Sequence, residues 1–221
     1  MRPRIKICCI KSDAEAAMAI THGASALGLV GAMPSGPGVI SEETIAKIAA
    51  MVPPPIATFL LTSQRSADGI IAQQRRCRTN TLQLCDRVAV EVFPRLRAEL
   101  PGIALVQVVH ITGPEAVEYA VEVAGCVDAL LLDSGNPSLA VKRLGGTGCT
   151  HDWTVSRRIR DAVPVPVFLA GGLNATNVAE AVAVVQPFGL DLCSSVRTDD
   201  KLDPAKLCAF FDAMPDGDRV R

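Results

Sequence analysis

Cys8 and Asp133 are the two side chains whose chemistry could move protons on a carbon and an oxygen atom of one small molecule. A cysteine thiolate can take a proton from carbon, and a carboxylic acid can protonate a leaving oxygen. Each residue ends a short apolar run, where a strand would finish and a loop begin. Lys6 shares the strand face of Cys8, and its positive charge would favour the thiolate. We take Cys8 as a candidate base and Asp133 as a candidate acid; a purely buried role for Cys8 is the alternative.

Three other polar side chains lie at or near the ends of predicted strands, namely Gln83, His110 and Asp191. Together with Lys6 they are candidates for binding a substrate, because strand ends in an α/β barrel gather at one rim. His110 could act as a second acid or base, or serve only as a structural hydrogen-bonding group.

Three clusters of small residues follow predicted strands: 145–148, 171–172 and 194–195. Glycine lets backbone N–H groups approach an anion closely, and barrels often bind phosphate in the loops after strands seven and eight. Tight turns without a ligand are the alternative reading. We expect a phosphate group to bind at Gly146, Thr147, Gly171, Gly172, Ser194 and Ser195.

The composition excludes several classes of protein. Of the 221 residues, 49% are hydrophobic but only 4% aromatic, which suits a core of aliphatic strands and not a stacking platform for nucleic acid. A net charge of −1 offers no basic surface for nucleic acid or anionic lipid. The apolar stretches have strand length, so we expect no membrane partner and a cytoplasmic location. The eight cysteines lack CxxC spacing, and we expect no metal site among them.

Short β-branched runs alternate with helical stretches along the whole chain. This alternation predicts parallel strands joined by right-handed crossovers. Eight such units favour a single-domain α/β protein, a (β/α)8 TIM barrel over residues 1–213 with a polar tail at 214–221; a doubly wound open sheet is the alternative. Strands are expected at 4–9, 24–30, 55–62, 79–85, 103–111, 127–133, 166–170 and 188–193, and helices at 13–22, 42–51, 67–76, 88–100, 114–124, 153–162, 174–184 and 204–213.

Five motifs, taken together and in this order, resemble the phosphoribosylanthranilate isomerase family of tryptophan biosynthesis. They are Lys6-Ile7-Cys8, Leu131-Leu132-Asp133-Ser134, Gly145-Gly146-Thr147-Gly148 with Asp152-Trp153, Leu169-Ala170-Gly171-Gly172-Leu173-Asn174 with Asn177-Val178, and Asp191-Leu192-Cys193-Ser194. The resemblance runs from Lys6 to about Phe211. It implies a cofactor-independent barrel that catalyses an Amadori aldose–ketose isomerisation of an N-linked phosphoribosyl amine.

The resemblance also implies roles for individual residues. Asp133 would be the general acid that opens the ribose ring to a Schiff base. Cys8 would be the general base that takes the proton from C2, giving an enolamine that becomes the ketone. Asp191 matches a further active-site aspartate near the sugar, and the three loops of small residues would hold the phosphate.

The sequence departs from the family pattern at the end that would hold anthranilate. Gly38 stands in place of an arginine that binds the anthranilate carboxylate, and Cys85 in place of a histidine. Cys9 and Ser195 each stand in place of a glycine. A lost charge-assisted contact removes roughly 1.5–3 kcal/mol of binding free energy. Another cation could replace it, and the candidates are Arg65, Arg143 and Arg197.

Three hypotheses follow. The first is an isomerase that binds a phosphorylated small molecule, with phosphoribosylanthranilate ahead of a different aglycone, acting as a monomer or homodimer. The second is a non-catalytic barrel that binds a phosphosugar. The third is a barrel of histidine biosynthesis, which is disfavoured because that family has aspartate where Cys8 stands.

Overall fold

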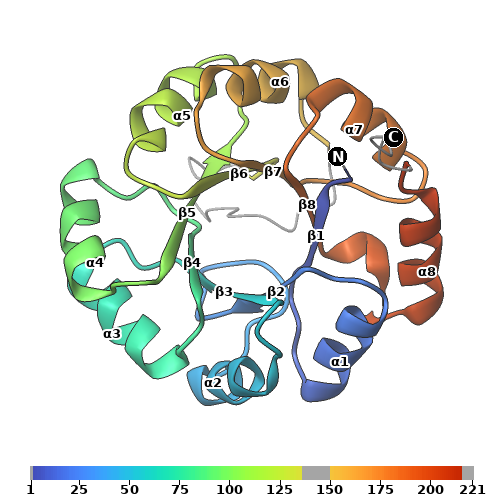
Figure 1. The fold of residues 1–221 in the computed structure, drawn as a ribbon, viewed down its shortest axis with the longest axis horizontal. Coiled ribbons are helices and arrows are strands. Elements are labelled where there is room, and N and C mark those ends of the chain that lie inside the picture. The colour runs from blue at the N-terminus through green and yellow to red at the C-terminus, as the bar shows by residue number, and fades with distance from the viewer. Residues whose placement is uncertain (1, 136–149, 216–221) are drawn as a thin grey trace.

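Eight parallel strands close into a barrel in the computed structural model, which describes residues 2–135 and 150–215. The strands follow one another around the barrel in chain order, and β1 pairs with both β2 and β8. Helices form a ring outside them (Figure 1). The strands are β1 (Arg4–Ile7), β2 (Ala26–Val30), β3 (Ala57–Thr62), β4 (Thr81–Leu84), β5 (Ala104–His110), β6 (Ala129–Asp133), β7 (Val167–Leu169) and β8 (Gly189–Leu192).

A helix follows each strand in the described part of the chain, and a short hairpin precedes the last helix. The α-helices are α1 (Asp13–Thr21), α2 (Glu42–Met51), α3 (Ala67–Cys77), α4 (Phe93–Glu99), α5 (Ala116–Ala124), α6 (Trp153–Ala162), α7 (Val178–Val185) and α8 (Pro204–Ala213). Two 3-10 turns, η1 (Val90–Val92) and η2 (Ser194–Val196), and the antiparallel strands β9 (Arg197–Thr198) and β10 (Lys201–Leu202) complete the described elements.

Serine side chains begin the first three helices. The hydroxyl groups of Ser12, Ser41 and Ser66 each accept the backbone N–H three residues further on, at 3.1–3.2 Å. A capping serine stabilises a helix because it satisfies an N–H group that has no partner within the helix. Ser12, Ser41 and Ser66 thus cap α1, α2 and α3.

Alternating strand side chains divide the core into two layers. Ile5 and Ile7 belong to the large cluster between strands and helices, whereas Cys8 belongs to a smaller cluster inside the barrel. Lys6 is fully buried, and its Nζ lies 5.2 Å from the centre of the Phe59 ring, which also belongs to the inner cluster. The period of two along a strand thus sends Lys6 and Cys8 inward, as the sequence predicts.

The barrel fold is confirmed, and the open sheet is wrong. Two helix starts differ from the expected ones, and one hairpin was not expected. The helix expected at 88–100 starts as η1, and α4 begins only at Phe93, where Pro94 fits the first turn because its missing N–H needs no partner there. The helix expected from residue 174 begins at Val178, because the side chains of Asn174 and Asn177 bind nearby backbone N–H groups instead. The β9–β10 hairpin was not expected.

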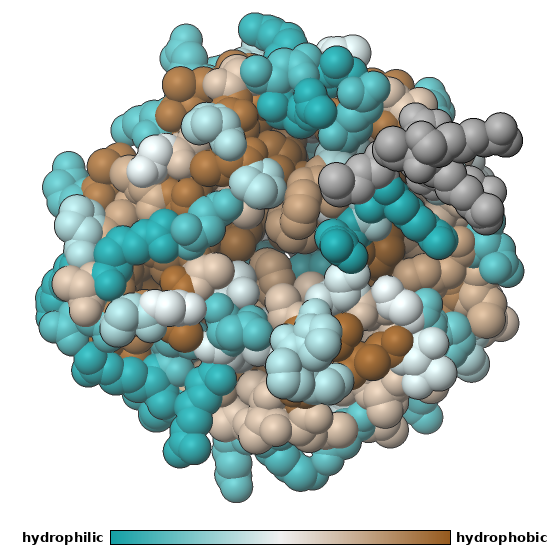
Figure 2. Space-filling model, viewed as in Figure 1, coloured by the Kyte–Doolittle hydropathy of each residue, from teal (hydrophilic) through white to brown (hydrophobic). Residues whose placement is uncertain are grey.

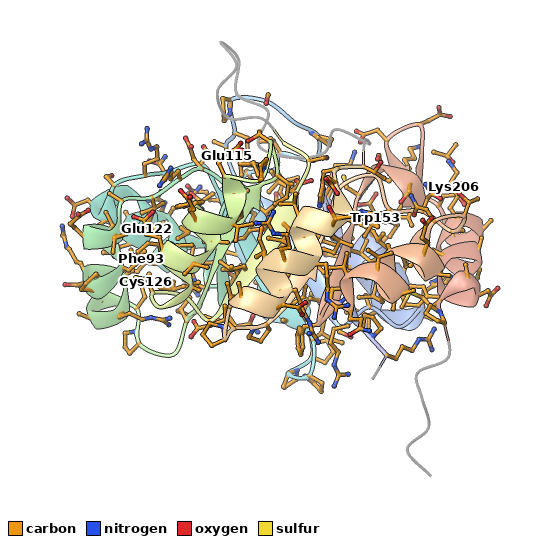
Figure 3. All side chains as sticks on the ribbon, turned by 90° about the horizontal axis from the view of Figure 1, so that it is seen from above. Phe93, Glu115, Glu122, Cys126, Trp153 and Lys206 are labelled. Carbon is orange, nitrogen blue, oxygen red and sulfur yellow. The ribbon has the colours of Figure 1, made fainter. Side chains whose placement is uncertain are left out.

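The two ends of the barrel are distinguishable in the side view. In Figure 3 the labelled Glu115, which precedes α5, lies nearer the upper end, and Cys126, which follows α5, lies lower. Because α5 begins where β5 has ended, the upper end carries the carboxyl ends of the strands. Figure 2 views the barrel along its axis and shows hydrophilic side chains around the perimeter, with apolar residues between them. Of the described helices, none combines the length and the apolar character that crossing a membrane requires.

Substitution of Gly189 would test how tightly the side chains inside the barrel are packed. A Cβ atom at this position would lie 2.5 Å from two ring carbons of Phe168, whose ring is flanked edge-on by Phe59 and Phe188. We expect Gly189→Ala to lower the free energy of unfolding by roughly 1–3 kcal/mol, measured by urea denaturation. Gly125→Ala is the matched control, because a Cβ there meets no atom within 4 Å. Equal stability of the two variants would contradict this packing.

Candidate active site

A pocket that is partly open to solvent lies at the carboxyl ends of the strands, with about 700 Å³ of empty space when the solvent at its mouth is counted. It contains both members of the expected acid–base pair, Cys8 and Asp133. Its walls come from loops after several different strands, as is usual for sites in this fold. The described lining residues are Cys8, Cys9, Val30, Met33, Ser35, Gly36, Pro37, Leu61, Gln83, Cys85, Asp133, Ala170, Gly171, Gly172, Leu173, Asp191, Leu192, Cys193, Ser194 and Ser195.

Cys8 is held directly after β1. Its backbone N–H donates to the carbonyl of Leu192 at 2.7 Å, which continues the pairing of β1 with β8. The space for its side chain comes from Gly28 on β2. A Cβ atom on Gly28 would lie 2.8 Å from Cys8 Sγ and 3.1 Å from Lys6 Nζ. Gly28 is therefore a functional residue that the sequence analysis missed, because a lone glycine in a predicted strand does not reveal its neighbours.

Lys6 and Asp191 form a buried ion pair beneath Cys8. Nζ lies 2.8 Å from Oδ1, with side-chain exposures of 0% and 8%. Burial alone would lower the pKa of Lys6, but the charges of Asp191 and Cys8 outweigh burial and raise it. Burial raises the pKa of Asp191, and the Lys6 ammonium opposes that shift. Lys6 is thus a permanent cation within the barrel, where its Nζ donates to Asp191. It is not among the described residues that line the pocket, so its expected contact with a substrate finds no support there.

Asp133 lies at the end of β6, opposite His110 of β5 in the register. Its Oδ1 accepts the backbone N–H of Ser134 at 2.7 Å, which fixes the carboxyl group at the pocket wall. His151 carries a lowered pKa because burial outweighs the charge of Asp133, and its Nε2 lies 2.7 Å from Ser156 Oγ. The side chain of His151 is half-buried.

Gln83 and His110 have different positions relative to the pocket. Gln83 lines it, and its Oε1 is buried without a hydrogen-bond partner among the described residues. The ring of His110 lies outside the lining, with Nε2 3.0 Å from the carbonyl oxygen of Cys85. This contact matches the structural role that the sequence left open for His110. A substrate-binding role for His110 finds no support in the lining.

The loops with small residues after β7 and β8 lie side by side at the pocket. Gly171 and Gly172 have φ angles of 84° and 63°, in the left-handed region that glycine adopts readily. The carbonyl of Gly172 accepts the side-chain amides of Asn174 and Asn177 at 3.2 and 3.0 Å, which fixes this turn. Ser194 and Ser195 complete the wall, and Ser195 Oγ is buried without a partner in the described part of the chain. Gly146 and Thr147 lie outside the described residues.

Comparison with known proteins identifies the relatives of this barrel. The family model for N-(5'phosphoribosyl)anthranilate (PRA) isomerase matches residues 5–213. The chain belongs to the PRA isomerase family. It is 31% identical over 208 residues to the N-(5'-phosphoribosyl)anthranilate isomerase of Methanocella arvoryzae, covering 94% of this chain and 95% of that protein. Over 195 residues it is 37% identical to the enzyme of that name from Haloferax volcanii, covering 88% and 84%.

Solved structures agree with this assignment. Phosphoribosyl anthranilate isomerase from Thermotoga maritima matches with a TM-score of 0.81 and 28% identity, covering 96% of this chain and 98% of that one. A phosphoribosyl anthranilate isomerase in complex with reduced 1-(o-carboxyphenylamino)-1-deoxyribulose 5-phosphate matches with a TM-score of 0.79 and 25% identity, covering 96% and 97%. The family resemblance of the sequence motifs is therefore confirmed, and PRA isomerases are aldose–ketose isomerases.

Two departures from the PRA isomerase pattern contact each other. Gly38, with a φ of 80°, packs on Cys9 so closely that a Cβ at residue 38 would lie 2.5 Å from Cys9 Cβ. Cys9 itself has a φ of 61°, which is unusual for a residue with a side chain. The Cβ and Cα atoms of Cys9, together with its sulfur, thus occupy space that any side chain at residue 38 would need. Sequence reasoning noted both positions but had no means of pairing them.

The expected substitute cations do not line the pocket. Arg197 is buried against Glu15, with Nη1–Oε1 and Nη2–Oε2 distances of 3.0 Å, and it also donates to the carbonyl of Cys9. The guanidinium of Arg65 donates to the carbonyl of Arg87 at 3.1 Å, away from the lining residues. Arg143 lies outside the described residues. Among the described residues, no cluster of three or more metal-binding side chains occurs.

Removing the Lys6 side chain should leave the buried Asp191 carboxylate without its ion-pair partner and destabilise the fold. We expect Lys6→Met to lower the free energy of unfolding by roughly 3–5 kcal/mol, because a charge is left buried without its partner. The double variant Lys6→Met/Asp191→Leu should recover most of that loss. Urea denaturation of both variants measures the difference, and a double variant no more stable than the single one would contradict the pairing.

The Glu15–Arg197 pair should make stability depend on pH. Burial raises the pKa of Glu15, but hydrogen bonds from Arg197 and from two backbone N–H groups lower it by more. The net result is a pKa below its ordinary value of 4.5. A carboxyl with a lowered folded-state pKa stabilises the fold above pH 4.5, and this contribution is lost as the pH falls through the folded-state pKa. Glu15→Gln should therefore destabilise the protein by roughly 3–5 kcal/mol at pH 7.

The difference between Glu15→Gln and the unmodified chain should shrink in thermal scans below pH 4.5. Glu99→Gln is the control, because its pair with Arg75 is exposed and should contribute less than about 1 kcal/mol. The assignment fails if the two variants melt together at pH 7.

Proposed function

We propose that this chain is a PRA isomerase that converts N-(5'-phosphoribosyl)anthranilate into an aminodeoxyribulose phosphate by an Amadori rearrangement. The observation that carries the proposal is that one pocket contains Cys8, Asp133 and the small-residue loops after β7 and β8. The names of the relatives and the substrate-derived compound bound in a related structure support it.

Asp133 acts as the general acid in this mechanism. It donates a proton to the ring oxygen of the ribose, so the C1–O bond breaks and the nitrogen lone pair forms a Schiff base at C1. The neighbouring N–H of Ser134 holds the carboxyl group in place, at 2.7 Å from Oδ1. A fixed acid at a strand end avoids the entropic cost of bringing an acid from solution.

Cys8 acts as the general base. Its thiolate takes the proton from C2, and the electrons of that bond move into C1–C2 to give an enolamine, which tautomerises to the ketone. Lys6 supplies a positive charge below the thiolate, and Asp191 keeps that charge in place at 2.8 Å. We assign Asp191 to the sugar, since it is the member of this pair that reaches the pocket.

The phosphate is assigned to Gly171, Gly172, Ser194 and Ser195. The glycines permit a close approach of backbone N–H groups, and the buried Ser195 hydroxyl has no other partner among the described residues. Gly146 and Thr147 are proposed for the same role from the sequence motif alone.

A different aglycone, or phosphosugar binding without catalysis, is the second candidate. It is favoured by one observation: the described lining contains no lysine or arginine, and residues 35–37 supply only a serine, a glycine and a proline there. Measured turnover of phosphoribosylanthranilate would separate a working isomerase from a protein that only binds a phosphosugar.

Turnover of phosphoribosylanthranilate, followed by loss of its fluorescence, tests the proposal. The unmodified chain should turn the substrate over, and Cys8→Ser and Asp133→Asn should each lower kcat by roughly 10²–10⁴-fold. Cys208→Ser, an exposed cysteine on α8, should retain full activity.

Binding of reduced 1-(o-carboxyphenylamino)-1-deoxyribulose 5-phosphate, measured by calorimetry, separates loss of chemistry from loss of the pocket. Both active-site variants should still bind it. An unmodified chain that binds the compound but shows no turnover would overturn the isomerase assignment and favour the second candidate.

A further inference from the structure

Cys9 and Cys193 meet at the wall of the pocket. Their Sγ atoms are 2.8 Å apart, closer than two unbonded sulfur atoms ordinarily approach, and both thiols are free. The two residues follow β1 and β8, which are hydrogen-bonded neighbours with Ile7 opposite Leu192. By that register Cys193 lies opposite Cys8, and Cys9 follows one residue further along, so the two cysteines extend neighbouring strands with an offset of one residue.

The surroundings hold the Cys9 sulfur in this place. The left-handed backbone of Cys9, with a φ of 61°, is stabilised where its carbonyl accepts the guanidinium of Arg197, itself bound to Glu15. On the other side Gly38 lies against Cys9 so closely that any side chain there would collide with it. A strained residue fixed from both sides indicates a built arrangement, not an incidental contact.

The two sulfurs differ in reactivity. Hydrogen bonding by Cys9 lowers the pKa of Cys193, whereas the contacts with Cys193 and Cys8 raise the pKa of Cys9. Cys193 is half-buried and Cys9 is 4% exposed, and both line the pocket. Cys193 is therefore the better nucleophile and the sulfur that a small molecule reaches first.

We propose that Cys9 and Cys193 are a redox-active dithiol, a modification site for small-molecule disulfides of the glutathione class, whose closure to a Cys9–Cys193 disulfide stops turnover. The Cys193 thiolate attacks one sulfur of the oxidant, forming a mixed disulfide and releasing one small thiolate. Cys9 then loses its proton and attacks the Cys193 sulfur, which releases the second small thiolate. Two protein thiols are oxidised, one small disulfide is reduced, and the two protons pass to the departing thiolates.

The position of this pair explains why its oxidation affects the site. Cys9 directly follows Cys8, and Cys193 directly precedes Ser194 and Ser195. A covalent bond between Cys9 and Cys193 pulls the base and the phosphate loop toward each other. A displacement of about 1 Å at a catalytic centre is enough to lower a rate on the order of 100-fold. This effect on turnover rests on the proposed isomerase function, whereas formation of the bond does not.

The bond itself is tested on the reduced full-length chain. The protein is incubated with oxidised glutathione, free thiols are blocked with N-ethylmaleimide, and tryptic peptides are identified by mass spectrometry. We expect peptide 7–11, which contains Cys8 and Cys9, to be joined to peptide 161–197, with fragmentation placing the link on Cys9. No cross-link, a link through Cys8, or equal cross-linking of the urea-unfolded chain would each overturn the proposal.

Variants separate the two steps. Cys9→Ser should leave one glutathione on Cys193, since the second thiol is missing, and Cys9→Gly should do the same while suiting the left-handed backbone. Cys193→Ser should take up no glutathione at this site. Cys208→Ser, which alters an exposed cysteine, should form the cross-link as the unmodified chain does. A Cys9→Gly chain that keeps no glutathione on Cys193 would count against Cys193 as the attacking sulfur.

Turnover is measured on the same oxidised samples. We expect a fall on the order of 100-fold that dithiothreitol reverses, in the unmodified chain and in Cys208→Ser. A cross-linked chain with unchanged turnover would refute the regulatory effect. A reduced chain without turnover, but with the cross-link, would refute the isomerase function and leave the dithiol site standing.

Discussion

The ion pair of Lys6 with Asp191 joins the two strands at which the barrel closes on itself. Both side chains are buried, so each depends on the other to avoid an unpaired charge in an apolar interior. Gly28 leaves room beside the pair, because a Cβ there would lie 3.1 Å from Lys6 Nζ and 2.8 Å from Cys8 Sγ. Cys8 and Cys193 lie two residues beyond Lys6 and Asp191, directly after the two strands end, so the ion pair helps to fix the position of the reactive groups next to it.

Most of the fold follows from patterns that act over a few residues. Ile5 and Ile7 pack against the helices, and the two-residue period of a strand therefore directs Lys6 and Cys8 inward. This direction follows from the strand alone and does not depend on residues distant in the sequence. Where the sequence misled, side chains competed with the backbone, as the asparagines before α7 do. The hairpin of β9 and β10 has strands of two residues each, too short to produce an alternating pattern.

The site was predictable to the extent that its residues stand at strand ends. Asp133 and Asp191 could be placed at the rim because parallel strands end together. Contacts between distant positions could not be placed: Gly28 against Cys8, or Arg197 against Glu15, follow from the closure of the barrel and not from any local spacing. For the same reason Arg197 looked free to bind a substrate, although Glu15 holds it in the interior.

Cys9 and Gly38 show that two separate departures from a family pattern can be one physical change. Residue 9 has a side chain in a left-handed conformation, and that side chain fills the volume in front of residue 38. A long basic residue at 38 and the Cys9 side chain in this conformation therefore exclude each other unless the loop after β2 moves. The pocket wall beside Gly38 thus holds the Cys9 side chain instead of a cation, and this side chain is the one whose sulfur touches Cys193.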